Sequence, residues 1–380
     1  MRLTQPLIHR IAISVFFFCC GCTFATWASR IPSIKEKFNL DEAQLGFVLF
    51  MLPLGAIIGL PFAGWAVHRF GSRWLTFISG ILYIGLLLGI GYSNSITVVS
   101  LLLFLFGFWG DVLNIAMNTQ ALLLQEELYS AKPLMSSFHG MWSLGAMTGA
   151  LMGGVLMKGN LTTAQHFFWA TACIVVLEVF FLFHLIKKDT AKSHEQKLFA
   201  WPDKALLLLG AICFCCALCE GAMADWSSLY YKQVINDINR VSTTGYTSFA
   251  FMMALGRLMG DKLTERLGYK GILTVNSILI AAGLGLAVGI QHPVAVIIGF
   301  GMVGLGVSTI IPIVYSLSGR TKTMATSAAL AAVSTVGFTG FLVGPPIIGF
   351  VAHAISLRWA LLIVLALGLL ILGLARKVKA

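Results

Sequence analysis

Residues 103–124, LFLFGFWGDVLNIAMNTQALLL, place an aspartate and two asparagines inside an apolar stretch that is long enough to cross a bilayer. Asp111, Asn114 and Asn118 are three and four residues apart, so a helix presents all three on one face. A carboxylate facing hydrocarbon costs several kcal/mol. The stretch therefore predicts a membrane helix whose polar face looks into a water-filled cavity or into the protein.

The rest of the chain is as apolar as this stretch. Of its 380 residues 58% are hydrophobic and 11% are charged, and the mean hydropathy is +0.88. This composition is typical of a membrane bundle, and the length holds roughly twelve spans of about 20 residues each. The net charge of +11 does not indicate nucleic-acid binding, because the basic residues lie between the apolar runs.

Twelve apolar runs are bounded by charged or turn-forming clusters. They cover residues 8–29, 43–67, 74–92, 97–122, 134–157, 165–186, 204–231, 241–261, 271–290, 293–317, 325–352 and 357–375. We therefore predict an all-α integral membrane fold with twelve transmembrane helices. Of the 26 lysines and arginines, 18 fall on the side of the two termini and 7 on the opposite side, and Arg257 lies inside a span. The positive-inside rule then places both termini in the cytoplasm.

All eight cysteines lie within predicted spans. Cysteine commonly behaves as a small buried hydrophobic residue, and nothing in the spacing indicates a disulfide framework. We expect no metal and no cofactor, although a metal site where two cysteine clusters meet stays the alternative.

The sequence repeats itself at an offset near 196 residues. FCCGC (18–22) is echoed by FCCALC (214–219), and GWAVHRFGSR (64–73) by DKLTERLGYK (261–270). The glycines of the fifth and eleventh spans also correspond: Gly145, Gly149 and Gly154 with Gly340, Gly344 and Gly349. This order predicts a duplication. The N-terminal half is 1–186, the cytoplasmic linker 187–203 and the C-terminal half 204–380.

Twelve spans, a basic mid-chain loop and a basic turn after spans two and eight resemble the major facilitator superfamily, whose turn motif is G-x-x-x-D-R-x-G-R-[RK]. His68 stands where the motif has its acid, and Asp261 replaces the first glycine of the second copy. The turns and their neighbours form the expected cytoplasmic gate: Gly64, His68, Arg69, Gly71, Arg73, Arg257, Asp261, Glu265, Arg266, Gly268 and Lys270. The alternative is that the cations only set topology. For Arg257 it is a local ion pair with Asp261.

Longer stretches are similar to the bacterial fucose-permease-like facilitators. They are TWASRIPSIKEKFNLDEAQLG (26–46), GDVLNIAMN (110–118), SSFHGMWSLGAMTGALMGG (136–154) and GRLMGD (256–261). The resemblance implies that Asp111 is the acid of the fourth span. The first span has no carboxylate, so a two-acid proton mechanism is not implied. Glu220 is the candidate substitute, and Glu178 lies on a span outside the cavity of this fold.

Candidate cavity residues combine carboxyl, amide and aromatic groups, which suit a small polar ligand. They are Asp111, Asn114, Asn118, His139, Trp142, Glu220, Trp27 and Tyr315, and the candidates for proton coupling are Asp111 and Glu220. The alternatives are an interhelical hydrogen-bond cluster for the Asp111 face and an interfacial aromatic belt for Trp27. Arg30 is expected to be a snorkelling end-cap or a gate contact.

We therefore expect a monomeric secondary active transporter in a bacterial inner membrane, importing a sugar, polyol or related metabolite together with a proton. A proton-linked efflux antiporter is the first alternative, because Gly145-x-x-x-Gly149-Ala150-x-x-Gly153-Gly154 resembles the glycine series of such antiporters. A receptor or scaffold without transport is the second. An enzyme is not expected, because no H-E-x-x-H or G-x-S-x-G motif is present.

Overall fold

The computed structural model describes residues 5–40, 42–129, 132–187, 203–235, 244–321 and 323–378. The apolar runs become helices whose ends lie close to the predicted ones. The predicted span 74–92 is helix Ser72–Tyr92, and 97–122 is Ile96–Leu123. Between them, Ser93 and Ser95 adopt extended backbone conformations that end one helix and begin the next.

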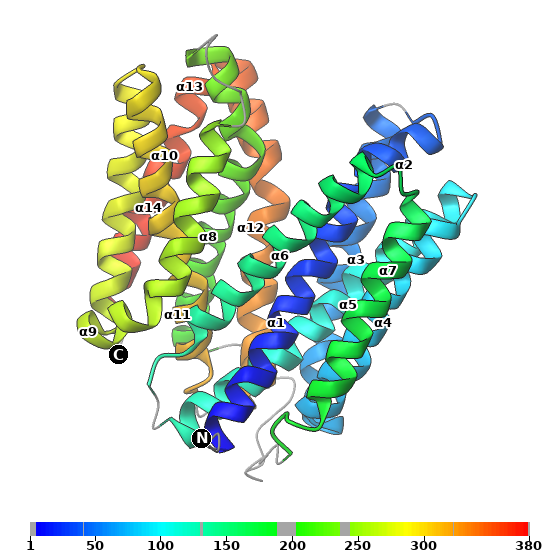
Figure 1. Cartoon of the computed structure of the whole chain (residues 1–380). Helices are drawn as coiled ribbons and strands as arrows, with labels where there is room; N and C mark the ends of the chain where they lie inside the picture. Colours follow the sequence, from blue (N-terminus) through cyan, green and yellow to red (C-terminus); the bar gives the residue numbers. More distant parts are fainter. Residues whose placement is uncertain are drawn as a thin grey trace. The chain divides into compact units, whose positions relative to one another are not determined.

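The chain forms two compact units, which are described separately (Figure 1). Unit 1 comprises 1–132, 141–200 and 322–331, and unit 2 comprises 133–140, 201–321 and 332–380. The helices whose larger part lies in unit 1 are α1 (Gln5–Ser29), α2 (Ile31–Lys37), α3 (Glu42–Phe70), α4 (Ser72–Tyr92), α5 (Ile96–Leu123), α6 (Met135–Lys158) and α7 (Thr163–Leu182). Those of unit 2 are α8 (Lys204–Tyr230), α9 (Thr244–Gly289), α10 (Pro293–Ser308), α11 (Ile310–Ser318), α12 (Thr326–Ala354), α13 (Leu357–Ala360) and α14 (Leu362–Ala375).

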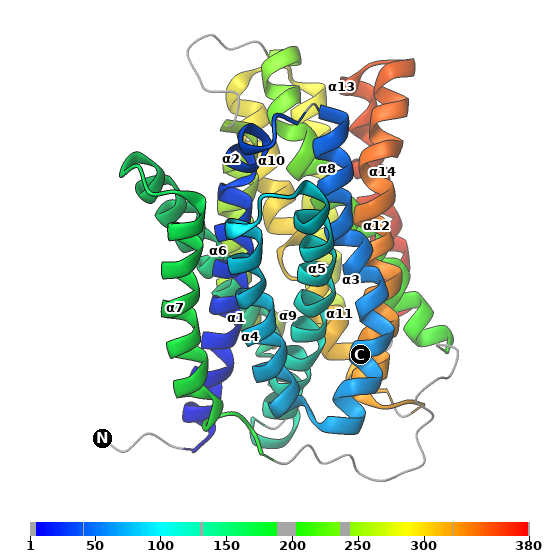
Figure 2. The ribbon, with the colours of Figure 1, turned by 90° about the vertical axis from the view of Figure 1, so that its right-hand side faces the viewer.

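In unit 1, α5 packs against α1, α3 and α4, while α7 packs against α1 and α4. Figures 1 and 2 both show α4 and α7 side by side. In unit 2, α9 packs against α10 and α14, and α8 packs against α11 and α14. Two helices contribute to both units, because the first residues of α6 belong to unit 2 and the first residues of α12 belong to unit 1.

Ten helices among the described residues are long and apolar enough to cross a membrane. One of them, Gly245–Gly289, is 45 residues long and contains Gly268 with non-helical backbone angles, where the sequence predicts the loop between two spans. The twelve-span count stays a prediction.

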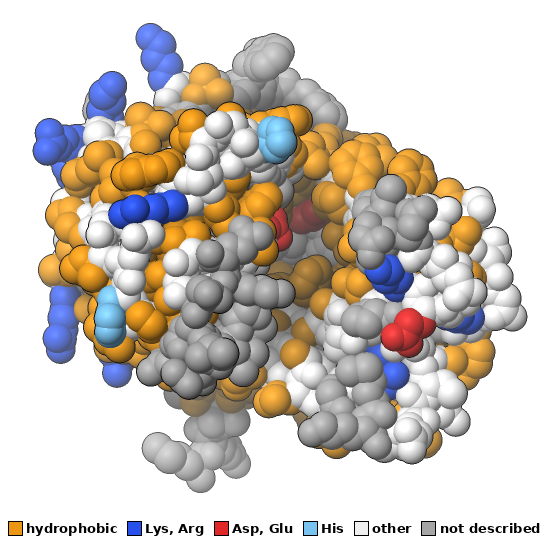
Figure 3. All heavy atoms as spheres, turned by 90° about the horizontal axis from the view of Figure 1, so that it is seen from above, with side chains coloured by type: hydrophobic (Ala, Val, Ile, Leu, Met, Phe, Trp, Pro, Cys, Tyr) orange, Lys and Arg blue, Asp and Glu red, His pale blue; other side chains and the backbone are white. Residues whose placement is uncertain are grey.

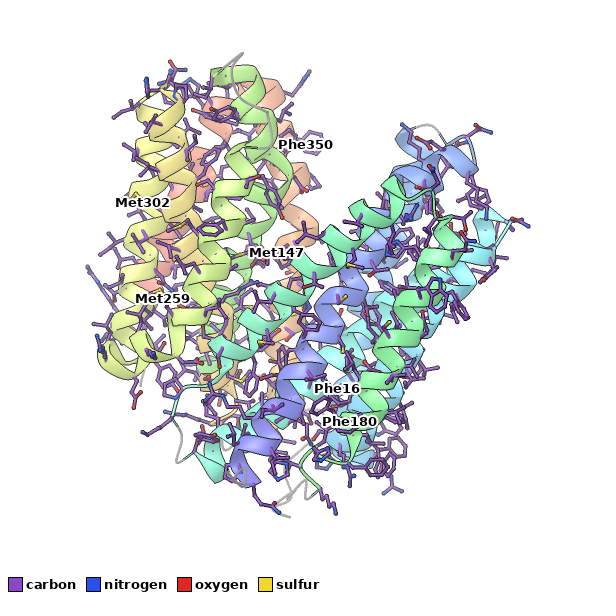
Figure 4. All side chains as sticks on the ribbon, viewed as in Figure 1. Phe16, Met147, Phe180, Met259, Met302 and Phe350 are labelled. Carbon is purple, nitrogen blue, oxygen red and sulfur yellow. The ribbon has the colours of Figure 1, made fainter. Side chains whose placement is uncertain are left out.

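Large apolar side chains are exposed on the helices, as a lipid-facing surface requires. Phe180 of α7 is 63% exposed, whereas Phe16 of α1 is fully buried (Figure 4). Figure 3 shows hydrophobic side chains spread over much of the visible surface. In lipid there is no penalty for this exposure, so the apolar outside is consistent with a membrane protein.

The internal repeat is visible in the packing of each unit. A β-carbon on Gly145 of α6 would overlap the carbonyl oxygen of Phe18 in α1, and one on Gly340 of α12 would overlap that of Phe214 in α8. Both glycines therefore allow a close approach of two helices at corresponding positions. The close-packing interpretation of these glycine series is the one that these contacts support.

Gly71 and Gly268 occupy the predicted turns. Their φ angles are 84° and 69°, in the left-handed region that favours glycine. Gly71 precedes the first residue of α4, and Gly268 interrupts α9. These backbone angles support the prediction of a turn at each glycine.

Candidate functional site

Helix α5 carries a hydrogen-bonded polar stripe, which we define as Asp111, Asn114 and Asn118. Asn114 Nδ2 donates to Asp111 Oδ1 over 3.4 Å, and Asn118 Nδ2 donates to Asn114 Oδ1 over 2.8 Å. Asp111 is 7% exposed and Asn118 is fully buried. Asn118 Oδ1 has no hydrogen-bond partner among the described residues. The stripe thus presents a carboxyl group and an unused amide acceptor to any ligand that reaches it.

Side chains of neighbouring helices in unit 1 flank this stripe. Tyr83 of α4 and Cys20 of α1 both interact electrostatically with Asp111. Gly110 lets the Tyr83 ring approach α5, since a β-carbon there would lie 2.9 Å from Tyr83 Cε2. Trp142 of α6 hydrogen-bonds to Cys20. Unit 1 therefore places three of the predicted cavity helices, α1, α5 and α6, around one polar region.

Unit 2 contains a second cluster, consisting of His139, Glu220, Arg257, Tyr315 and Ser334. Arg257 Nη2 donates to Glu220 Oε1 over 3.3 Å, and Ser334 Oγ donates to the Tyr315 hydroxyl over 2.7 Å. The His139 and Tyr315 rings meet edge to face with centroids 5.9 Å apart, and His139 also interacts electrostatically with Arg257. The cluster combines an ion pair with two aromatic rings.

Asp261 caps the beginning of α6. Its two carboxyl oxygens accept from the backbone N–H groups of Ser136 and Ser137, each over 2.9 Å. Ser136 Oγ also donates to the Arg257 carbonyl oxygen over 2.8 Å. An acid at a helix N-terminus satisfies unpaired N–H groups and interacts favourably with the helix dipole. These bonds give Asp261 a role that the local ion-pair interpretation did not include.

Most of the charged gate residues beside the two turns are exposed. His68, Arg69, Glu265, Arg266 and Lys270 are exposed at the ends of their helical segments. Arg73 Nε donates to the Leu182 carbonyl oxygen over 3.4 Å, which ties the beginning of α4 to the end of α7.

Gly64 lies against the first turn of α12. The Gly64 carbonyl oxygen accepts from Ser327 Oγ over 3.1 Å, and a β-carbon on Gly64 would lie 3.0 Å from Ala331 Cβ. In this structure Gly64 therefore serves a helix contact. Its gating role stays a prediction.

Trp27 and Arg30 at the end of α1 are both buried, with exposures of 2% and 4%. Arg30 Nε donates to His166 Nδ1 and Arg30 Nη2 to the Leu161 carbonyl oxygen, each over 3.0 Å. The snorkelling interpretation of Arg30 is therefore wrong, because its guanidinium turns into unit 1 toward α7. The burial of Trp27 is also unlike that of a lipid-facing belt residue.

Sequence reasoning missed Ser334 and the Arg30–His166 pair. Ser334 is one of many serines in apolar spans, and nothing local distinguishes it. His166 is 136 residues from Arg30 in the chain, so only the packing of α7 on α1 reveals the contact.

The comparison with protein families bears directly on this arrangement. The sequence model of the Major Facilitator Superfamily matches residues 11–328. The chain belongs to this superfamily. An uncharacterized MFS-type transporter of Yersinia pestis is 32% identical over 99% of this chain and 98% of its own length. The membrane protein MosC of Rhizobium meliloti is 30% identical over 95% of this chain and 88% of its own.

More distant facilitators have named cargoes. The cis,cis-muconate transport protein of Acinetobacter baylyi is 23% identical over 89% of this chain and 85% of its own length. The glucose/mannose transporter GlcP of Bacillus subtilis is 22% identical over 80% and 78%. The crystal structure of the facilitator FucP in the outward conformation superposes with a TM-score of 0.85 over 99% of this chain and 100% of that one. At 15% identity, this likeness concerns the fold. The chain is thus a multi-pass facilitator of a transporter family.

Proposed function

We propose that this facilitator takes up a small polar solute together with a proton, and that Asp111 binds and releases the proton. The observation that carries the proposal is the buried stripe on α5, in which the hydrogen bond that Asp111 accepts from the described residues is a long one, 3.4 Å, from Asn114. The described ion pairs give Asp111 no cationic partner. A buried carboxyl without a cation is less costly to bury when neutral, so it favours proton binding.

Each unit has its own proposed solute contacts: Asn114, Asn118, Trp142 and Trp27 in unit 1, and His139, Glu220 and Tyr315 in unit 2. Amide and hydroxyl groups recognise hydroxyl-bearing or carboxyl-bearing solutes by hydrogen bonding, and aromatic rings cover apolar faces. Relatives named for glucose and mannose and for cis,cis-muconate support both solute classes. Glu220 is the second candidate proton carrier, and it ranks lower because Arg257 already accompanies its charge.

We also propose that the halves 1–186 and 204–380 carry out an alternating-access cycle. The protein is proposed to be a monomer that lies in the inner membrane with both termini in the cytoplasm. Efflux in exchange for protons remains the competing direction. Gly145, the first glycine of the series that resembles those of antiporters, allows α6 to approach α1 closely. Helix packing therefore accounts for this glycine without efflux, which weakens the alternative.

The test uses purified protein in liposomes. Counterflow of radiolabelled glucose, mannose, cis,cis-muconate and a panel of polyols identifies the solute first. With that solute, Asp111→Asn should retain exchange, since the amide mimics the neutral acid, but should lose accumulation driven by an imposed pH gradient. Asn114→Ala should weaken binding and leave coupling intact. Undiminished accumulation by Asp111→Asn contradicts the assignment and moves it to Glu220.

A further inference from the structure

Glu178 is a buried acid that lies outside the proposed transport site. It sits on α7, is 1% exposed, and its Oε2 atom has no hydrogen-bond partner among the described residues. Its carboxyl group lies between α4 and α7, two helices of unit 1 that pack against each other, and we call this contact the seam. Nothing in the proposed solute site uses this carboxyl group.

The seam is shaped to hold the carboxyl group. A β-carbon on Gly80 of α4 would lie 2.7 Å from both Oε1 and Oε2 of Glu178, so the carboxyl group fills the space that any side chain on Gly80 would take. One turn away on the same face of α4, Thr76 Oγ1 is also buried without a partner. Two turns along α7, Thr171 Oγ1 donates to the Ile84 carbonyl oxygen over 3.3 Å. The seam therefore contains a polar strip centred on the Gly80–Glu178 contact.

The groups that face Glu178 offer no compensating positive charge. From α1, the thiols of Cys19 and Cys20 interact electrostatically with it. From α4 the contact is made by Gly80, which has no side chain. Basic groups of the flanking helices have other partners: Arg73 binds the Leu182 carbonyl oxygen, His166 binds Arg30, and His9 binds the His184 carbonyl oxygen.

This geometry favours the neutral form of the acid. A carboxylate buried in the seam without a cation costs several kcal/mol of desolvation, whereas the protonated group carries no charge. The contact with Gly80 holds the carboxyl group in the seam only while α4 and α7 stay packed together. If α4 and α7 moved apart, water would enter the seam and solvate the carboxylate of Glu178, so the neutral form would no longer be favoured.

We propose that Glu178 is a second proton-binding site of unit 1, separate from the Asp111 stripe, which holds its proton while α4 and α7 are packed and releases it when water enters the seam. The site deepens the proposed proton-coupled function. It also stands without it, because its proton is read directly rather than through transport.

Infrared titration of the protein in lipid nanodiscs tests the site. The difference spectrum between the protein and Glu178→Gln isolates the carboxylic C=O stretching band of Glu178. We expect this band to be present at neutral pH and to be replaced by carboxylate bands as the pH is raised. Asp111→Asn should leave it in place. A carboxylate signal at neutral pH, or a C=O band that persists at every pH at which the protein stays folded, overturns the proposal.

Two glycine variants of α4 locate the site. Gly80→Ala should change both the band position and the pH at which the band disappears, because the added methyl group displaces the carboxyl. Gly85→Ala is the matched control, since nothing lies within 4 Å of a β-carbon there. Equal spectra for the two variants show that Gly80 does not shape the site, and so contradict the proposal. Because no solute is added, these results do not depend on whether Asp111 couples transport to protons.

Discussion

Three acids of the spans have different surroundings: Asp111 and Glu178, which are buried, and Glu220, which is partly exposed. Asp111 has amide neighbours on its own helix, Glu178 fills the space above a glycine, and Glu220 meets Arg257. An ion pair can be buried with its charges balanced, whereas an isolated acid is less costly to bury when it holds a proton. The proposed proton sites Asp111 and Glu178 differ from the Glu220–Arg257 ion pair in the groups that surround each acid, and not only in how deeply the acid is buried.

Arg30 makes a prediction at this scale. Arg30→Ala leaves the buried His166 Nδ1 and the partly buried Leu161 carbonyl oxygen without their donor, and an unsatisfied buried group costs about 1–3 kcal/mol. We expect a clear drop in the thermal unfolding temperature in detergent, with only partial recovery in Arg30→Lys, whose ammonium cannot reproduce the guanidinium geometry. Arg266→Ala, at an exposed position, is the control. Equal unfolding temperatures for Arg30→Ala and the control would contradict the structural role.

Sequence reasoning succeeded where the signal is local. The stripe of Asp111, Asn114 and Asn118 follows from spacings of three and four residues. The partners of Arg30 and Glu178 lie on other helices, so no spacing predicts them. The sequence places Glu178 on a span outside the predicted cavity. Its contact with Gly80 is revealed only by the packing of α4 against α7.

At the scale of elements, bilayer thickness makes helices predictable, because each apolar run must be about as long as the hydrocarbon core is thick. The short helix α2 and the π-helical turns at Leu124–Leu128 and Tyr231–Ile235 escaped prediction, since they are too short to show a periodic pattern. Gly71 and Gly268 were predictable because a basic turn between two apolar runs demands a reversal.

Gly268 allows a clean test of backbone strain. A β-carbon there would have nothing within 4 Å, so Gly268→Ala changes only the cost of a backbone conformation with positive φ and extended ψ, about 1–3 kcal/mol. Gly289→Ala is the matched control, because it too has open space but its φ is not positive. We expect chemical unfolding to show destabilisation of the first variant and not of the second. Equal stability would mean that the turn relaxes readily into another conformation.

At the scale of the whole molecule, the repeat is the organising feature. Gly145 meets Phe18 in unit 1 as Gly340 meets Phe214 in unit 2, and these pairs are separated by the offset seen in the sequence. Duplication explains why one packing solution occurs twice. The polar residues do not follow this symmetry: Asp111 belongs to one unit, and the Glu220–Arg257 pair to the other.

Membrane orientation is tested by labelling single cysteines with a reagent that does not cross lipid. The distribution of basic residues predicts that His194→Cys is reached from the cytoplasm and Asp237→Cys from the periplasm. Both positions lie outside the described residues. The eight native cysteines, labelled in the parent protein, provide the background. Access to both positions from the same side of intact cells and inverted vesicles would show that the twelve-span order is wrong.

The exchange of short segments between the units has a consequence for biogenesis. When residues 1–200 have been synthesised, the chain contains 133–140, which belong to unit 2, but lacks 322–331, which belong to unit 1. Asp261, which caps α6, also emerges later than the helix it caps. Neither the fragment 1–200 nor the fragment 201–380 therefore contains every residue of the unit to which it contributes most. The last contacts of unit 1 can form only after residues 322–331 have been synthesised.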